Sequence, residues 1–452
     1  MKAHYVRGLM LEQQGRAEEA LEAYNQALEG DPAHLGALDR KGAIHDARGE
    51  FEGSLDCARR FIEIDGRNAG AHRNLGLMLR EMGKFEEAER SLRAAISLDP
   101  GLENAASHLA LVLIDQGRLD EAERILSDVL SAAPDHVEGR WTSALIYLQQ
   151  GRFDVGWDLY ESREARRGAS QRRGAVPEWD GRSAPDGPLL IYSEQGLGDE
   201  IMFASCFNDV LRLAPSCIIE CEPRLERLFR RSFPAAAILP GAGARGLPPV
   251  AAQIATGSLP GHFRRSWSDF PRHSGYLVPE PAKVAAWRER LRGLGPGLKA
   301  GSAWTGGALK TRRRLRSIEL RQLLPIVSSD QARFVSLQYV ESAAEIAAFN
   351  ETHGPVIHHW PEATGDYDET AALVAALDVV ISVSTAVVHL AGALGKPVWV
   401  MVPAAPEWRY LRRGDAMPWY PSARLWRQQR LGDWEPVIAG IREALVTFRA
   451  AC

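Results

Sequence analysis

The sequence predicts an α-helical solenoid followed by two α/β lobes, and three patterns support this fold class. The front of the chain has a 34-residue period, marked by Gly15, Gly49, Gly83, Gly117 and Gly151. From residue 188 onward, short β-rich runs alternate with helical patterns, as they do in doubly wound parallel sheets. Residues 189–203 place a strand, a glycine turn and a helix start in succession, which is typical of a ligand-binding sheet edge.

The charge is distributed unevenly along the 452 residues. Residues 1–164 contain 19 Lys+Arg against 30 Asp+Glu, a balance of −11, and the remainder contains 35 against 28, a balance of +7. An acidic front half and a basic rear half argue against a general nucleic-acid binder and favour an anionic small ligand in the rear half. We therefore expect no nucleic-acid partner.

The cysteines and the apolar stretches together favour the cytoplasm as the compartment. Five scattered cysteines suit free thiols in a reducing environment. No basic-then-apolar leader opens the chain, and the most apolar stretch, residues 371–395, is interrupted by Asp378 and His389. The expectation is a cytoplasmic protein without a membrane span.

The repeats of residues 1–164 also place alanine and proline in register, at Ala20, Ala88, Ala122, Pro32, Pro100 and Pro134. Small residues let paired helices approach closely, and each pair buries its apolar stripe against its neighbours, which produces a curved solenoid with a concave groove. The pattern resembles tetratricopeptide repeats. We expect the groove to dock a protein or peptide; a spacer or oligomerisation arm is the alternative. In the repeat arms of O-GlcNAc transferases, asparagines at the sixth repeat position grip peptide backbone, and only Asn74 matches here.

Residues 165–187 are rich in Arg, Gly and Pro and predict a linker, in which Trp179 staples the arm to the next domain. We expect a first lobe at 188–296 and a second lobe at 297–452, whose final helix, 433–448, crosses back to the first. The predicted strands are 189–193, 217–222, 237–239, 253–256, 299–304, 333–337, 356–358, 379–383 and 398–402.

The first lobe opens with a turn that contains Glu194, Gln195, Gly196, Gly198 and Asp199. The two glycines allow the backbone to approach a ligand closely. The turn is neither a dinucleotide fingerprint, whose third glycine position is occupied here by Ile201, nor a Gly-Lys-Ser/Thr phosphate loop. We place it on the acceptor side of the site.

The second lobe carries the predicted anion site. Ser384 and Thr385 stand between a strand and a helix start, where hydroxyl and free N–H groups suit a diphosphate; a plain helix N-cap is the alternative. The segment after the first strand of this lobe projects to the same sheet edge and contains Trp304, Gly306, Lys310 and Arg316. Lys310 and Arg316 are the predicted phosphate contacts.

Together these motifs resemble the bacterial tetratricopeptide-linked glycosyltransferases related to the ADP-heptose:lipopolysaccharide heptosyltransferase superfamily, from about Trp157 to the C-terminus. The residues that carry the resemblance are 194–199, 304–317, 336–338, 384–395, 419–421 and 427–428. The resemblance implies a GT-B fold of two Rossmann-like lobes, a nucleotide-sugar donor on the second lobe, no cofactor or essential metal, and inversion at the anomeric carbon.

The resemblance also assigns roles. Asp199 matches the proposed catalytic base of heptosyltransferases, with a helix N-cap as the alternative. Gln338 and His389 join the donor-binding residues, although His389 can also pack inward. The chain departs from the family at Ser384-Thr385-Ala386, where heptosyltransferases have Asp-Thr-Gly.

An Asp-x-Asp sequence at Asp366 and Asp368 is similar to the metal site of other glycosyltransferases, but it precedes a helix. We interpret Asp368 as the N-cap and expect no metal there.

The implied activity is transfer of a sugar to Ser or Thr hydroxyls of a protein recruited by the repeat arm. Similar chains modify flagellin, so flagellin is the expected acceptor. The alternatives are a non-catalytic adaptor that retains the fold, and transfer to a lipid or saccharide.

Overall fold

The computed structural model describes residues 2–166, 176–241, 248–307, 312–339 and 342–448. They form two compact units. The first contains Met1–Thr142 and Ala308–Leu315, and the second contains Ser143–Gly307 and Arg316–Cys452.

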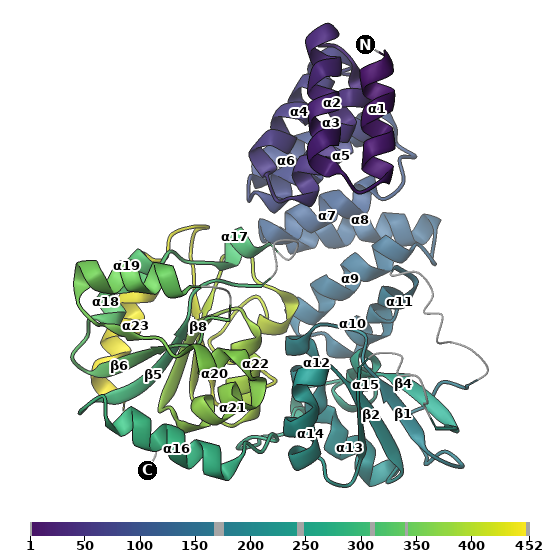
Figure 1. The fold of residues 1–452 in the computed structure, drawn as a ribbon. Coiled ribbons are helices and arrows are strands. Elements are labelled where there is room, and N and C mark those ends of the chain that lie inside the picture. The colour runs from purple at the N-terminus through teal and green to yellow at the C-terminus, as the bar shows by residue number, and fades with distance from the viewer. Residues whose placement is uncertain (1, 167–175, 242–247, 308–311, 340–341, 449–452) are drawn as a thin grey trace. The chain divides into compact units, whose positions relative to one another are not determined.

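The first unit is a stack of helix pairs (Figure 1). Its helices are α1 (Lys2–Gln13), α2 (Ala17–Gly30), α3 (Leu35–Ala47), α4 (Phe51–Ile64), α5 (Ala69–Glu81), α6 (Phe85–Leu98), α7 (Ala105–Asp115) and α8 (Leu119–Ala132), and α9 (Val137–Gln150) spans the division between the units. The periodic glycines lie in the turns with φ between 72° and 79°, where an L side chain is strained. The three packing alanines are fully buried, as the period predicts.

The first unit also contains residues that follow a strand of the second unit. Arg312 donates a hydrogen bond of 2.8 Å to Asp115, and Arg314 donates one of 3.1 Å to Glu52. Asp115 also accepts a 2.6 Å bond from Arg80. Arginines of this segment are thus held by carboxylates of the repeat array.

The second unit begins within the last predicted repeat, because residues 143–164 belong to it. Its first complete helices are α10 (Phe153–Tyr160) and α11 (Ser162–Arg166). The buried indole of Trp157 packs edge-on against Trp408 and Trp419, with centroids 5.4 and 6.2 Å away, and donates a 2.9 Å bond to the carbonyl of Arg264. These contacts join α10 to segments of both sheets.

The first sheet has four parallel strands in the order β3-β2-β1-β4. They are β1 (Leu189–Tyr192), β2 (Cys217–Cys221), β3 (Ala237–Pro240) and β4 (Ala252–Ala255), with helices α12 (Leu197–Phe203), α13 (Phe207–Leu213), α14 (Glu226–Ser232) and α15 (Leu259–Phe263). Trp179 anchors the linker to the first sheet: it is buried, donates its backbone N–H to the carbonyl of Gln253 in β4 at 2.8 Å, and packs near Phe263. These contacts all lie on the side of the next domain, so the predicted staple to the arm stays a prediction.

The second sheet has six parallel strands in the order β10-β9-β8-β5-β6-β7. They are β5 (Leu298–Ala303), β6 (Ala332–Ser336), β7 (Ile357–His358), β8 (Val379–Val383), β9 (Val398–Val402) and β10 (Ala423–Arg427). Its helices are α16 (Pro281–Arg292), α17 (Arg313–Arg316), α18 (Leu324–Val327), α19 (Ala343–His353), α20 (Pro361–Gly365), α21 (Tyr367–Ala376), α22 (Ala386–Ala393) and α23 (Glu435–Thr447). Read from β7, the order is 3-2-1-4-5-6, that of the doubly wound dinucleotide-binding sheet.

The final helix, α23, packs its apolar face on the second sheet, where Val437, Ile438 and Ile441 share one core with Phe334 and Ile381. The sequence analysis expects this helix to cross back to the first lobe, whereas these contacts hold it on the second.

Two further expectations can be compared with the described residues. None of the described helices is both long enough and apolar enough to cross a membrane. The cysteines among them are free, buried thiols, at Cys57, Cys206, Cys217 and Cys221, and burial raises the pKa of each. Cys452 lies outside the described residues.

Candidate active site at the carboxyl ends of two parallel sheets

The second sheet reverses its strand order between β5 and β8, and ligands of such sheets bind beyond the carboxyl ends of the strands at this point. The loops after β5 and β8 meet there. A Cβ atom on Gly306 would lie 3.3 Å from the carbonyl oxygen of Ser384 and 3.1 Å from Cβ of Arg316. The structure therefore brings together three of the predicted donor-binding residues, and any side chain at position 306 would be tightly packed between the other two.

The loop after β5 is shaped by hydrogen bonds to its backbone. The Oε1 atom of Gln338, directly after β6, accepts the N–H groups of Trp304 and Thr305, both at 3.1 Å. The N–H of Gly306 donates to Oγ of Ser317 at 3.1 Å. The Trp304 ring is buried in the core of the second sheet. Trp304 and Gln338 therefore hold the loop in shape, Trp304 by packing in the core and Gln338 by accepting hydrogen bonds from the loop backbone.

Lys310, the other predicted phosphate contact, lies outside the described residues.

Ser384 and Thr385 have different surroundings. Thr385 is the N-cap of α22, since its Oγ1 atom accepts the N–H of Val387 at 3.2 Å. The capping interpretation therefore holds for Thr385. Ser384 is buried, and its Oγ atom makes no hydrogen bond within the described residues. Burial, and then the charge of Glu407, raise the pKa of the Tyr410 phenol.

His389 packs inward. Its side chain is 3% exposed, and its Nδ1 atom lies 3.1 Å from the hydroxyl of Tyr420. Burial, with Arg409 adding to it, holds the pKa of His389 well below its ordinary value, so the ring is neutral at pH 7. A Cβ atom on Gly198 would lie 3.1 Å from Cδ2 of His389, so this glycine permits the close contact of α12 with α22.

Asp199 contacts a cation from the other sheet. Its Oδ1 atom lies 2.5 Å from Nη1 of Arg409, which follows β9. Nε of Arg409 is 3.9 Å from Glu407, and Glu407 accepts a 3.0 Å bond from Arg316. Acidic and basic side chains thus alternate in one row across the carboxyl ends of both sheets. We call this row the charge row, and it consists of Asp199, Arg409, Glu407 and Arg316.

The helix-cap alternative for Asp199 is wrong. The N-cap of α12 is Gly196, and no side chain caps that helix. Asp199 lies in the first turn, where its backbone N–H donates to the carbonyl of Gly196 at 2.9 Å. Its carboxylate is therefore directed to Arg409.

Sequence reasoning missed Glu407 and gave Arg409 no part in the charge row. No local motif marks either residue, because Glu407 ends the irregular segment 403–407 and Arg409 lies in a 3-10 helix of only three residues, Trp408–Tyr410. One pattern does point to them: they are charged and follow a fully buried strand, β9, whose carboxyl end lies at the ligand-binding edge.

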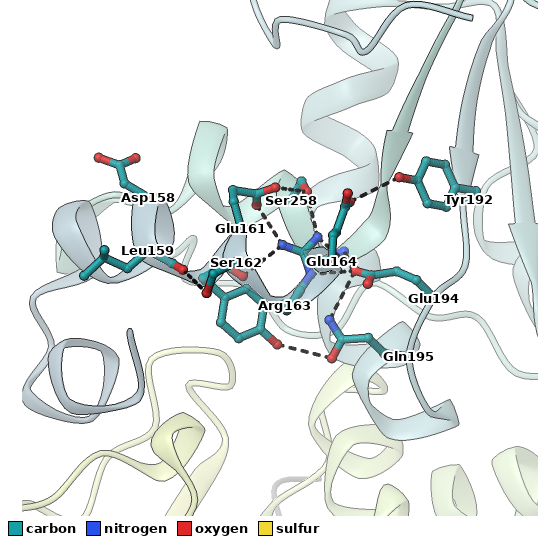
Figure 2. A network of polar contacts seen from close by, with 12 residues as sticks. Asp158, Leu159, Glu161, Ser162, Arg163, Glu164, Tyr192, Glu194, Gln195 and Ser258 are labelled. Atoms are coloured by element: carbon teal, nitrogen blue, oxygen red, sulfur yellow. Dashed lines mark hydrogen bonds and ion pairs between the residues drawn. The ribbon is translucent and has the colours of Figure 1, made fainter. Parts of the chain in front are cut away.

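The glycine turn of the first sheet is held by α10 and α11 (Figure 2). Arg163 is 2% exposed and donates to Glu194 at 2.9 Å and to Ser258 at 2.7 Å. Glu194 also accepts the N–H of Gly257 at 3.2 Å, and Gln195 accepts the hydroxyl of Tyr160 at 3.2 Å. The guanidinium therefore sits between the carboxyl ends of β1 and β4, where the order of the first sheet reverses.

Glu200, next to Asp199, is buried and bonded to the ends of two strands. It accepts hydrogen bonds from the hydroxyl of Ser193 and, at 2.9 Å, from the N–H of Glu222. Burial raises the pKa of Glu200 to about 7. The side chain thus ties the ends of β1 and β2 together.

The Asp-x-Asp sequence is part of an ion-pair cluster. Asp366, and not Asp368 as predicted, is the N-cap of α21, because it accepts the N–H of Asp368 at 2.9 Å. Asp368 is buried and pairs with Arg231 and Lys283. Across the described residues, no group of three or more His, Cys, Asp and Glu side chains is placed to hold a metal ion.

Comparison with known proteins identifies the front of the chain. Residues 1–34, 40–103, 79–145 and 113–154 match family models described as tetratricopeptide repeat. The first unit is an array of tetratricopeptide repeats. Protein FlbA of Caulobacter vibrioides (strain ATCC 19089 / CIP 103742 / CB 15) is 34% identical over 317 residues, which are 66% of this chain and 53% of that protein. The chain thus spans about half the length of this curated relative.

Two solved structures are similar to about a third of this chain. MamA is 22% identical, with 35% of this chain and 94% of that chain covered and a TM-score of 0.32. YrrB, described as a TPR protein with an unusual peptide-binding site, is 19% identical, with 36% and 84% covered and a TM-score of 0.31.

The tetratricopeptide array contains a cavity of about 710 Å³ between α3, α4 and α5. Asn74, the asparagine at the sixth repeat position, lines it. Arg40, the equivalent residue one repeat earlier, is bonded to Glu12 at 3.0 Å through its Nε atom.

Proposed function

We propose that the second unit is an inverting, metal-independent glycosyltransferase of the GT-B plan. It moves a sugar from a nucleotide-sugar donor to a Ser or Thr hydroxyl of a protein recruited by the tetratricopeptide array. The observation that supports this most directly is the 3-2-1-4-5-6 order of the second sheet, with Gly306, Arg316 and Ser384 gathered at its switch point and Asp199 across from them.

In the proposed reaction the acceptor oxygen attacks the anomeric carbon, and the bond from that carbon to the diphosphate oxygen breaks. The carboxylate of Asp199 takes the hydroxyl proton, and the nucleoside diphosphate leaves with the bonding electrons. Attack from the face opposite the leaving group inverts the anomeric centre.

The charge row explains how the base and the phosphate-binding cation would be positioned for the reaction. Arg409 holds the carboxylate of Asp199 in one orientation before the acceptor arrives. Arg316, at 3.0 Å from Glu407, is the described cation nearest to the Gly306 turn, and it would turn part of its hydrogen-bonding capacity to the leaving diphosphate. His389 is neutral at pH 7 and would supply shape to the site without charge.

Several parts of this proposal rest on the family resemblance. Metal independence, inversion and flagellin as the acceptor are taken from it. The free, buried cysteines fit the cytoplasm as the compartment.

A thermal-shift panel of UDP-, GDP-, ADP- and CMP-sugars on the full chain tests the donor site. A donor at about 100 times its Kd stabilises the native state by about 2.7 kcal/mol. We expect one nucleotide class to raise Tm in the native protein and in Asp199→Asn, while only the native protein releases nucleoside diphosphate when an acceptor is present. Transfer that persists in Asp199→Asn would remove Asp199 as the base.

A non-catalytic adaptor is the second candidate, and two observations favour it. Ser384 stands where heptosyltransferases have an aspartate, and Asp199 is already neutralised by Arg409. The same panel separates the two, because an adaptor would show no stabilisation by any donor. Transfer to a lipid or saccharide would instead give donor stabilisation and product formation without a protein acceptor.

A further inference from the structure

The cavity of the tetratricopeptide array has an apolar floor. Its volume of about 710 Å³ is lined by side chains of α3, α4 and α5, which include Leu38, Cys57, Phe61 and Leu77. A cavity of this size admits several amino-acid side chains, and burial of aliphatic side chains against its apolar floor is favourable.

The ionisable side chains that line the cavity are all acidic: Asp39, Asp46 and Glu81. The Oε1 atom of Glu81 lies 3.6 Å from Nη1 of Arg80. In contrast, Asp39 and Asp46 are exposed, and no cation of the described chain reaches ion-pair distance of either. Two carboxylates without an ion-pair partner in the described chain therefore line the cavity beside its apolar floor.

The array already binds cationic side chains of its own chain. In the first unit, Asp115 accepts a hydrogen bond from Arg312, and Glu52 accepts one from Arg314. Burial raises the pKa of Glu81, at the end of the cavity, and the charges of Arg80 and Arg312 oppose this rise. The array thus binds arginines of its own chain through carboxylates outside the cavity, whereas Asp39 and Asp46 inside it have no ion-pair partner in the described chain.

The spacing of the two carboxylates sets the spacing of the cations. Asp39 and Asp46 are seven residues apart on α3, which is about 10 Å along a helix that rises about 1.5 Å per residue. A polyproline-type segment advances about 3.1 Å per residue with three residues per turn, so residues i and i+3 share one face about 9 Å apart. Two basic residues three positions apart match the two carboxylates.

We propose that this cavity binds an extended segment of the acceptor protein with two lysines or arginines three residues apart, paired with Asp39 and Asp46. An aliphatic side chain between the two cations lies on the floor formed by Leu38 and Leu77. The proposal rests on the proposed function only where it calls the partner the acceptor, because binding needs no catalysis. The negative charge of the cavity disfavours nucleic acids and other anions.

Fluorescence polarisation with the full chain tests the proposal. The probes are labelled twelve-residue peptides of Ala, Ser, Pro and one Leu that contain Lys-x-Leu-Lys, the same peptide with both lysines replaced by glutamine, and one with the two lysines adjacent. We expect the first to bind about tenfold tighter than the glutamine peptide at low salt and to lose this advantage near 1 M salt, where the screening length falls to about 3 Å. The adjacent-lysine peptide should fall between them.

Matched charge variants locate the effect. Asp39→Asn with Asp46→Asn should bring the lysine peptide to the affinity of the glutamine peptide. Asp120→Asn with Asp128→Asn, on α8 and outside the cavity lining, removes the same charge and should leave the affinity unchanged. Circular dichroism and urea unfolding check that each variant is folded.

Three outcomes would overturn the proposal. They are equal affinity for the lysine and glutamine peptides, equal loss in the two double variants, and tighter binding of a single-stranded oligonucleotide than of any peptide. Failure of glycosyl transfer is a separate result. Charge-dependent binding without transfer keeps this inference and rejects the enzyme, whereas transfer without charge-dependent binding does the reverse.

Discussion

The guanidinium of Arg409 lies 2.5 Å from the carboxylate of Asp199, so a cation carried by the second sheet holds the carboxylate that follows the first strand of the first sheet. This contact depends on two residues 210 positions apart in the chain. It joins the two halves of the proposed active site before any substrate is bound.

The Asp199–Arg409 pair leads to a first prediction. Arg409→Met should lower the turnover of the proposed transfer by about two orders of magnitude, because the base loses its orienting partner. Arg409→Lys, which keeps the charge, should retain more turnover than the methionine variant. Nucleoside-diphosphate release measures both, and Tm controls for folding. Equal turnover in the two variants would show that the charge has no role.

The cap of α22 leads to a second prediction. Thr385→Val keeps the shape and removes the hydroxyl that accepts the N–H of Val387, so it should lower the free energy of unfolding by about 1 kcal/mol. Thr385→Ser keeps the hydroxyl and should be close to the native protein. Urea unfolding measures both. A valine variant of native stability would mean that this hydroxyl contributes nothing as a cap.

The buried Arg163 leads to a third prediction. Arg163→Met leaves Glu194 without its guanidinium and should lower the free energy of unfolding by about 3 kcal/mol. Arg265 is a matched control, because it pairs at 2.7 Å with Asp158 of α10 at the surface. Arg265→Met should cost less than about 1 kcal/mol. Similar losses in the two variants would contradict the importance of burial.

The raised pKa of Glu200 leads to a fourth prediction. The carboxyl has an ordinary pKa of 4.5 when unfolded and about 7 when folded. Between these values only the unfolded state loses the proton, so the contribution of Glu200 to stability is complete below pH 4.5 and is lost as the pH rises through 7.

Glu200→Gln mimics the protonated form. Its stability relative to the native protein should therefore rise from pH 4.5 to pH 7, by up to about 3 kcal/mol. Urea unfolding of both proteins at several pH values measures the difference. A difference that is independent of pH would show that Glu200 titrates normally.

Strands that are buried on both faces could be predicted closely from the sequence. The predicted 379–383 and 398–402 have the bounds of β8 and β9, because continuous apolar runs between turn residues leave little ambiguity. β10 was missed because an edge strand that alternates polar and apolar residues has no such run. After β1 the chain forms two short helices, α12 and α13, separated by a 3-10 turn at Ala204–Cys206.

The candidate site could be predicted only where it follows a strand end. Ser384 and Gly306 were found because strand, turn and helix follow one another locally. The partner of Asp199 could not be predicted in this way, because its contact with Arg409 depends on how the two sheets pack. The choice of Asp368 over Asp366 failed because both are good N-caps, and the ion pairs with Arg231 and Lys283 that engage Asp368 are remote in sequence.

The position of α10 and α11 in the second unit has a consequence for chimaeras. The aromatic and polar contacts beneath the glycine turn are made by Trp157, Tyr160 and Arg163, although the repeat period assigns these residues to the arm. A repeat array transplanted from another protein should therefore be joined ahead of Ser143, where the second unit begins. A junction at the linker would remove these three side chains, and these contacts, together with the arm.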